Sequence, residues 1–219
     1  DFSKGVTFDF FRVGKETDIS SLKLVGNHVG YRDQDFSGSY DKYGKFKMSF
    51  GYNQIPLFYS DSTLTLYTSP SAGVYVLDDK MQSGVQDKIF NLTQAAKNSL
   101  PVEVRSSRNI SDYKIKYNST PNRAYTFAVK DTHVSGTQPW GTNFGFTLAS
   151  EIPLELNRRT TNFDAGIELS NSYAFIRFGY DGSFFRNNIP ILTWDNPLRI
   201  GDSLTAGPAM GRMALWPDT

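Results

Sequence analysis

The chain contains no cysteine and only two histidines among its 219 residues. The absence of cysteine excludes disulfides, thiolate metal sites, cysteine nucleophiles and covalent haem attachment within the chain. His28 and His133 stand apart from any metal-ligand spacing, so no metal-binding residue is expected. The chain also lacks a run of about 18 apolar residues, which excludes a membrane-spanning helix.

No long stretch carries charge of one sign, and 23 basic residues nearly balance 22 acidic ones. This balance argues against a nucleic-acid partner. Hydrophobic residues make up only 39% of the chain, below the usual share of about 45–50%. Aromatic residues nevertheless reach 15%. This composition suits a β-barrel that exposes every second side chain to lipid, and it also suits an aromatic-rich soluble sandwich.

What the chain does contain is alternation of apolar and polar side chains with a period of two. In the clearest case, Phe46, Met48, Phe50 and Tyr52 are interleaved with charged or small residues. Such alternation predicts strands with one apolar and one wet face. Their lengths approach the roughly 9–11 residues of a tilted membrane-spanning strand. Seven long strands are predicted near residues 5–13, 20–32, 40–53, 110–118, 123–133, 160–170 and 173–182.

Within one strand, the charged side chains fall at alternate positions, so they share the same parity and the same face. A Lys or Arg facing lipid at mid-bilayer costs about 2–4 kcal/mol, so the charged parity is predicted to face the lumen. The predicted lumen residues are Lys45, Lys47, Asp112, Lys114, Lys116, Asp164, Glu168 and Arg177. The predicted lipid-facing residues are Phe46, Met48, Phe50, Ile115, Phe127, Ile167, Ile176 and Phe178.

The predicted connections differ greatly in length. Residues 119–122 and 171–172 have the composition of tight turns. Residues 54–109, 134–159 and 184–219 form long segments, which outer-membrane barrels place outside the cell. The pattern predicts an all-β, transmembrane antiparallel barrel, with residues 1–219 as a single partial barrel domain. We expect the chain to be a fragment of a larger barrel, with one short helix over 84–99.

Two features suggest other chemistry. Residues 201–204 read Gly-Asp-Ser-Leu, as in a family of serine esterases, but neither histidine is placed to serve as the base that Ser203 would need. We interpret this match as coincidence and expect no catalytic residues. Trp140, Trp194 and Trp216 lie in the long segments and could stack on sugars, which keeps a soluble sugar-binding β-sandwich open as an alternative.

Several strings between residues 52 and 218 are characteristic in combination. They are Tyr-Asn-Gln-Ile-Pro at 52–56, Gly-Thr-Gln-Pro-Trp-Gly at 136–141, Phe-Gly-Phe at 144–146, Glu-Ile-Pro at 151–153, Gly-Tyr-Asp-Gly-Ser-Phe-Phe-Arg-Asn at 179–187, Trp-Asp-Asn-Pro at 194–197 and Gly-Arg-Met-Ala-Leu-Trp-Pro-Asp at 211–218. In this order they resemble the decahaem-associated outer-membrane β-barrel family, MtrB/PioB. The resemblance covers most of residues 40–219.

This resemblance implies a structural barrel in the bacterial outer membrane rather than an enzyme. It also implies that the barrel is larger than this chain, which would be its N-terminal portion. Family members form a porin–cytochrome complex, in which the barrel surrounds a periplasmic multihaem c-type cytochrome for extracellular electron transfer. The expected partners are that cytochrome, an extracellular cytochrome and outer-membrane lipid. The haem belongs to the partner, so no cofactor-binding residue is expected in this chain. Some members carry a Cys pair near the N-terminus, which is missing here. A general outer-membrane porin or substrate channel is the main alternative.

Overall fold

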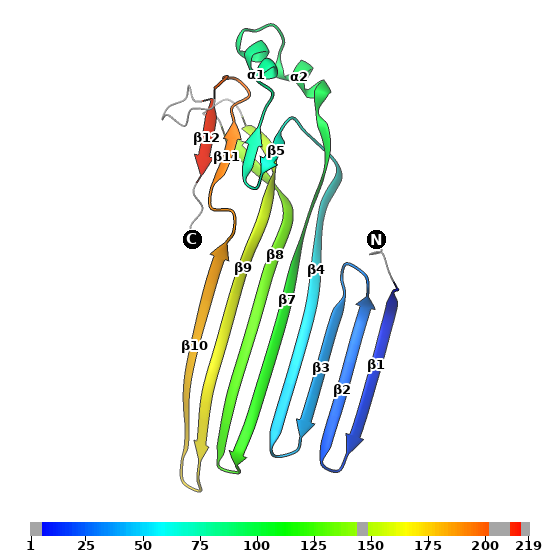
Figure 1. Ribbon diagram of the computed structural model, residues 1–219, viewed down its shortest axis with the longest axis vertical. Coiled ribbons are helices and arrows are strands. Elements are labelled where there is room, and N and C mark those ends of the chain that lie inside the picture. Colours follow the sequence, from blue (N-terminus) through cyan, green and yellow to red (C-terminus); the bar gives the residue numbers. More distant parts are fainter. Residues whose placement is uncertain (1–5, 144–148, 202–210, 216–219) are drawn as a thin grey trace. The chain divides into compact units, whose positions relative to one another are not determined.

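A computed structural model of the protein describes residues 6–143, 149–201 and 211–215. Its elements in chain order are β1 (Phe8–Thr17), β2 (Ser20–Val29), β3 (Asp35–Lys42), β4 (Phe46–Thr65), β5 (Thr68–Ser71), β6 (Val74–Val76), α1 (Asp79–Gln86), α2 (Leu92–Ala95), the 3-10 helix η1 (Ala96–Asn98), β7 (Leu100–Thr120), β8 (Arg123–Asn143), β9 (Ala149–Ser170), β10 (Phe175–Asn187), β11 (Leu192–Asp195) and β12 (Arg212–Leu215). Figure 1 shows this predominance of long strands. The all-β prediction is confirmed.

The chain divides into two compact units. Unit 1 comprises Asp1–Pro56, Ser107–Val134 and Arg159–Arg186, and unit 2 comprises Leu57–Ser106, Ser135–Arg158 and Asn187–Thr219. Five strands, β4, β7, β8, β9 and β10, begin in one unit and end in the other, although β10 has only its last residue in unit 2. Each unit is described by itself below.

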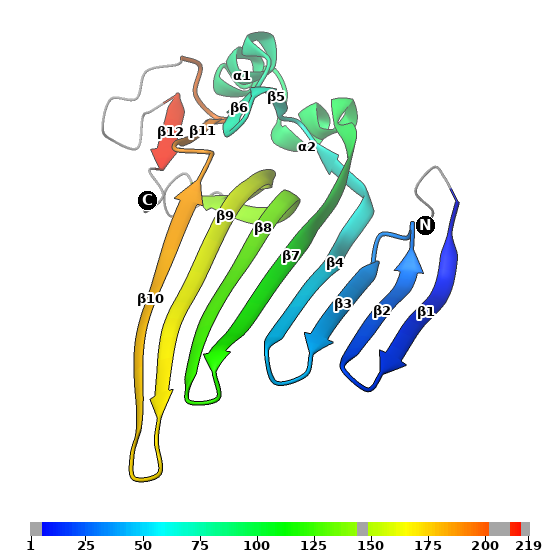
Figure 2. The ribbon, with the colours of Figure 1, turned by 60° about the horizontal axis from the view of Figure 1, so that its bottom comes forward.

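Unit 1 contains most of an eight-stranded sheet with the order β1-β2-β3-β4-β7-β8-β9-β10. Neighbouring strands lie side by side in both ribbon views (Figures 1 and 2). β1 to β4, β7 with β8, and β9 with β10 follow one another as hairpins, whereas residues 66–99 separate β4 from β7. Local turn chemistry sets where these hairpins reverse. Gly44 adopts a φ of +71° between β3 and β4, a conformation that suits glycine. The Asn171 carboxamide oxygen accepts bonds from the backbone N–H groups of Tyr173 and Ala174, both at 2.8 Å, between β9 and β10.

The predicted number of long strands was too low by one. Residues 40–53 were predicted as one strand, but the turn at 43–45 divides them into the end of β3 and the start of β4. Residues 33–39, predicted as a linker, supply the first half of β3. Apolar and polar residues continue to alternate through this turn, so the sequence pattern alone did not reveal the turn.

The alternating aromatic residues of the first predicted strand lie on the polar side of the sheet. Phe8 and Phe10 are paired with Val29 and Asn27. Because paired residues share a face, both rings are on the same side as the polar residues of β3 and β4. Phe11 and Val13 lie on the other side and take the apolar role in β1.

Unit 2 holds nearly all of the buried apolar side chains in the described part of the chain. They are Tyr67, Tyr75, Leu77, Ala95, Val104, Ile152, Leu154, Leu156, Ile189, Leu192 and Trp194, whereas unit 1 contributes Ala124 alone. A small sheet with the order β12-β11-β6-β5 belongs to this unit, with β11 parallel to β6. The burial pattern of unit 2 is that of a compact, water-excluding core.

Asp195 forms hydrogen bonds that link separate segments of unit 2. Its carboxylate accepts bonds from the Leu77 backbone N–H at 2.9 Å and from Arg212 Nε at 2.7 Å. The Tyr67 hydroxyl donates to the Asp195 carbonyl at 2.9 Å, and burial raises the pKa of Tyr67 above its usual range. The side chain of Asp195 is only 3% exposed, so this charge depends on its partners.

The segments predicted as long connections contain regular secondary structure. Residues 134–159 are mainly strand, and residues 54–109 contain strands and helices. The single predicted helix over 84–99 is replaced by α1, α2 and η1, because the chain breaks at Lys88, whose φ is +60°. Asp78 caps α1 by accepting from the Met81 N–H, and Asn91 forms a capping box with Gln94 in α2. None of the helices in the described ranges is long and apolar enough to cross a bilayer.

Candidate functional site

The sheet of unit 1 has two faces of opposite character. Along β3 and β4, Tyr40 lies opposite Met48 and Gly38 opposite Phe50, while Asp41 lies opposite Lys47 on the other side. We call the first the apolar face; its members include Val13, Leu22, Leu24, Tyr40, Phe46, Met48, Phe50, Tyr113, Ile115, Tyr117, Tyr125, Phe127, Val129, Phe163, Ile167, Ile176, Phe178 and Tyr180. We call the second the polar face.

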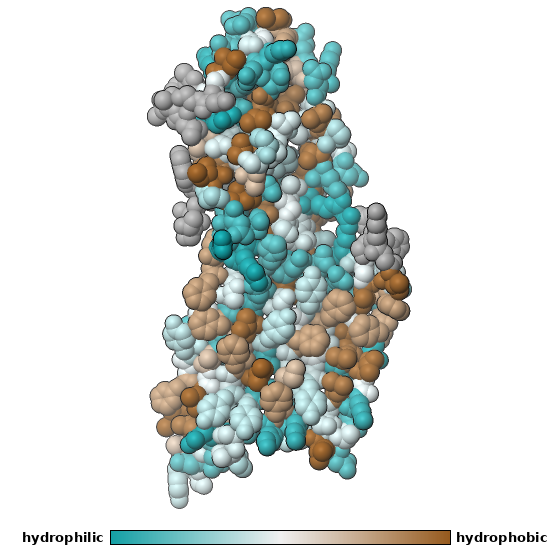
Figure 3. Space-filling view, in the orientation of Figure 1, coloured by the Kyte–Doolittle hydropathy of each residue, from teal (hydrophilic) through white to brown (hydrophobic). Residues whose placement is uncertain are grey.

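The apolar face is exposed rather than covered. Phe50 is 38% exposed, Phe127 48% and Phe178 64%, so no protein layer packs on them. Their aromatic rings contact one another across strands, as in the stacked pairs Tyr117–Tyr125 and Phe163–Phe184. Figure 3 shows such side chains gathered over the strands of unit 1. An exposed apolar surface of this extent needs an apolar environment.

The polar face carries charges that pair across strands. Lys116 Nζ lies 2.8 Å from Glu168 Oε2, Lys47 Nζ lies 3.6 Å from Asp41 Oδ2, and an Arg177 nitrogen lies 3.9 Å from Asp164 Oδ1. All these side chains remain partly exposed, so each pair contributes at most about 1 kcal/mol. Their value to the protein is a hydrated face of mixed sign, rather than stability.

Small side chains on β8 make room for the ion pair between Lys116 and Glu168, whose partners lie two strands apart. Lys116 is on β7 and Glu168 on β9, so their contact passes over β8. Ala124, on the polar face of β8, is 8% exposed, although it belongs to no apolar core. An ideal Cβ on Gly166 would lie 2.7 Å from Thr126 Oγ1, which places Thr126 on the same face. Small residues here leave room above the strand for the two long side chains.

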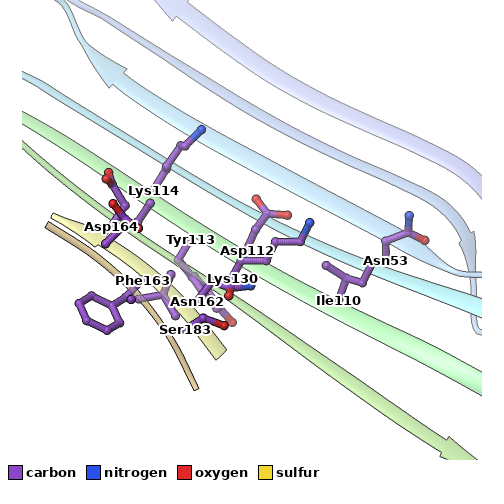
Figure 4. A pocket seen from close by; sticks show the side chains of 14 residues that line it. Asn53, Ile110, Asp112, Tyr113, Lys114, Lys130, Asn162, Phe163, Asp164 and Ser183 are labelled. Atoms are coloured by element: carbon purple, nitrogen blue, oxygen red, sulfur yellow. The ribbon is translucent and has the colours of Figure 1, made fainter. Parts of the chain in front are cut away.

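Two adjoining hollows cover much of the polar face. The larger, of about 670 Å³, is lined by Asp112, Lys114, Lys130, Asn162, Asp164, Asp181 and Ser183, among others. The second, of about 400 Å³, lies over β2, β3 and β4, and both hollows are lined in part by Asn53 and Asp112. Figure 4 shows Asp112, Lys114 and Asp164 extending to one side of the strands and the Phe163 ring to the other. Both hollows are open, and their linings combine apolar surface with charged groups of both signs.

The structure places all but one of the predicted lumen residues on the polar face. Those on it are Lys47, Asp112, Lys114, Lys116, Asp164, Glu168 and Arg177. Lys45 lies instead in the turn between β3 and β4, where its backbone N–H bonds to the Lys42 carbonyl at 2.9 Å. The eight residues predicted to face lipid are all on the apolar face. Which face meets lipid and which meets the lumen stays a prediction.

The sequence interpretation missed several members of the polar face. Lys130, Asn162 and Ser183 line the larger hollow, and Lys23, Asp35 and Asp41 lie on β2 and β3. The parity of Lys130 was a usable signal, because it alternates with Phe127 and Val129. Asp41 also shares the parity of Lys47 within the predicted strand 40–53, whereas Asp35 lies in a part of β3 that was not predicted as strand.

The alternative chemistries find little support. In the described ranges, no group of three or more His, Asp or Glu side chains could hold a metal ion. His28 Nδ1 lies 2.8 Å from Asp33 Oδ2 in the β2–β3 connection, and this hydrogen bond lowers the pKa of Asp33. Trp194 is 7% exposed and so is not placed to stack on a sugar. Ser203 and Trp216 lie outside the described residues.

A sheet of long strands with one exposed apolar face and one hydrated face defines a class of protein, the membrane β-barrel. In soluble sheets the apolar face packs on a core, and unit 1 has no such core among its described residues.

The chain belongs to the MtrB/PioB family of outer membrane beta-barrel porins, whose family model matches residues 2–219. The protein is therefore an outer-membrane β-barrel protein, as predicted from its sequence. No curated protein gives a significant match to the chain.

Proposed function

We propose that the polar face of unit 1 lines a wide bore that holds a periplasmic multihaem c-type cytochrome. In this role the protein is a structural sheath, not an enzyme, and the haem groups of the partner carry electrons across the outer membrane. An extracellular cytochrome could receive them on the far side. The observation that carries the proposal is the mixed-charge, hollowed polar face, together with membership of the family.

The chemistry of the polar face suits a protein partner. Lys114 and Lys130 stand beside three aspartates in the larger hollow, so a partner surface of either sign finds a complement. Each such contact is exposed and worth at most about 1 kcal/mol, and binding would therefore need many of them with matching shape. The cysteine-free sequence fits a sheath whose cofactors all belong to its partner.

Charge reversal tests the proposal. The double change Lys114→Glu and Lys130→Glu should reduce the cytochrome that co-purifies with the barrel several-fold, most strongly at low ionic strength, because exposed charges are screened by salt. Haem staining of the complex, purified from outer membranes, measures the loss. Lys80→Glu with Lys97→Glu is the matched control, since it makes the same charge change on exposed residues of unit 2.

Undiminished haem recovery in the Lys114/Lys130 variant, with the control also normal, would refute these contacts. A general diffusion porin is the competing function, because the same hollows are open and carry charged side chains. A porin would co-purify with no haem at all and would admit small solutes in a liposome-swelling assay. The two measurements together separate a sheath from a channel.

A further inference from the structure

At the end where its strands continue into unit 2, the apolar face carries a row of polar side chains in place of aromatic ones. On β1 to β4, Asp9 accepts a bond from Tyr31, and Gln34 Nε2 donates to Gln54 Oε1 at 3.0 Å. On β8 and β9, Asp131 bonds to Arg159 and Thr161. A change from exposed aromatics to paired polar groups at one level is expected where hydrocarbon gives way to lipid headgroups.

The row is not uniform in charge, because its β9–β10 part carries two arginines. The backbone bond from Asn188 N–H to the Asn157 carbonyl, at 2.8 Å, sets the pairing of β9 with β10. A Cβ added to Gly182 would touch the Phe163 ring, which fits the same register. Arg159 and Arg186 lie between these two points and are therefore opposite each other on the apolar face.

The two arginines differ in how they are held. Arg159 Nε donates to Asp131 Oδ1 at 2.8 Å, and Thr161 Oγ1 donates to the same oxygen at 2.7 Å. Asp131 thus fixes the guanidinium, while the Arg159 side chain stays 62% exposed. Arg186 is exposed and forms no ion pair with any residue in the described ranges. Two guanidinium groups and one carboxylate therefore leave this cluster with a net positive charge.

Directly beside the arginines the apolar face resumes. Phe184 precedes Arg186 by two positions on the same face, and its ring stacks on Phe163 with centroids 5.8 Å apart. A ligand for this place would need an anionic group next to a hydrocarbon chain. A guanidinium fork matches the geometry of phosphate oxygens, and stacked rings offer a surface for acyl chains.

We propose that Arg159 and Arg186 bind a phosphate of an outer-leaflet glycolipid, of the lipid A type, with its acyl chains on Phe163 and Phe184. The outer leaflet is chosen because barrels turn their long connections outward, and the long connections leave unit 1 at this end. The site is independent of any cytochrome, so the sheath proposal and this one can fail separately.

Native mass spectrometry of the protein purified from outer membranes, with added diphosphoryl lipid A, tests the site. The wild type should keep a bound lipid A, and Arg159→Gln with Arg186→Gln should weaken this binding about tenfold, since charge-assisted contacts are lost. Arg159→Lys with Arg186→Lys, which keeps charge without the fork, should give a smaller loss. The control is Lys42→Gln with Arg123→Gln, which removes two cations at the turn end of the same face.

Three results would overturn the proposal. The first is undiminished lipid A binding by a correctly folded glutamine variant, with folding judged by heat-modifiable gel migration. The second is equal binding of dephosphorylated lipid A, which would assign the affinity to acyl chains alone. The third is equal binding of phosphatidylglycerol, or displacement by inorganic phosphate, which would point to general anion attraction. Haem recovery should be unchanged in the glutamine variant, so this readout keeps the two proposals apart.

Discussion

Phe127 and Ala128 are neighbours on β8 that point to opposite faces of the sheet, which makes them a direct test of the membrane assignment. Phe127 lies on the apolar face and is 48% exposed. Ala128 lines the larger hollow on the polar face. Phe127→Arg and Ala128→Arg introduce the same side chain one residue apart, so backbone context and net charge are matched.

The expected costs follow from where each residue lies. On the apolar face of β8, Phe127 is midway between Arg123 and Asp131, about 13 Å along the strand from each. This places it near the centre of the hydrocarbon, where an arginine costs about 2–4 kcal/mol. Ala128→Arg enters an open hollow that already holds Asp164 and Asp181. Its effect should stay within about 0.5 kcal/mol.

The free energy of unfolding, measured by urea titration of the barrel in lipid vesicles, provides the comparison. Phe127→Arg should lower the unfolding midpoint markedly, or prevent insertion, while Ala128→Arg should fold like the wild type. Equal costs for the two variants, or a larger cost for Ala128→Arg, would refute the assignment of the apolar face to lipid.

Two further predictions concern stability. Asp195→Ala should destabilise unit 2 by about 3–5 kcal/mol, because it leaves the largely buried Arg212 and the Leu77 N–H without their partner. Limited proteolysis should then cut unit 2 faster, and unchanged cleavage would count against this role of Asp195. A double-mutant cycle of Lys116→Gln and Glu168→Gln should give a coupling energy of at most about 1 kcal/mol in urea unfolding, and a much larger value would show that the pair is shielded from water.

Alternation allowed the class of fold to be predicted from sequence, because a period of two survives whenever both faces of a strand meet different solvents. Met48 and Phe50 against Lys47 are a clear case. The same rule failed at β1, where Phe8 and Phe10 alternate well but lie on the polar face. Apolar alternation identifies a strand, but it does not say which side of the sheet the apolar parity occupies at an edge strand.

The polar face was easiest to predict where charges repeat within one strand. Lys114 and Lys116 stand out in this way, whereas Lys130 shares its parity with Ala124, Thr126 and Ala128. Those small residues carry no signal in sequence. Their purpose emerges only when β7 and β9 are placed on either side of β8, since they leave space for Lys116 to reach Glu168.

The sequence by itself determined that this protein has long two-faced strands, no spanning helix within the described ranges and no cysteine chemistry, because these properties depend on composition and on neighbours along the chain. Only the tertiary structure decided which residues come together across strands: the buried Asp195–Arg212 pair, the hollows of the polar face and the opposed Arg159 and Arg186. Those pairings depend on register between segments far apart in sequence. Register is set by hydrogen bonds and side-chain packing that no local pattern records.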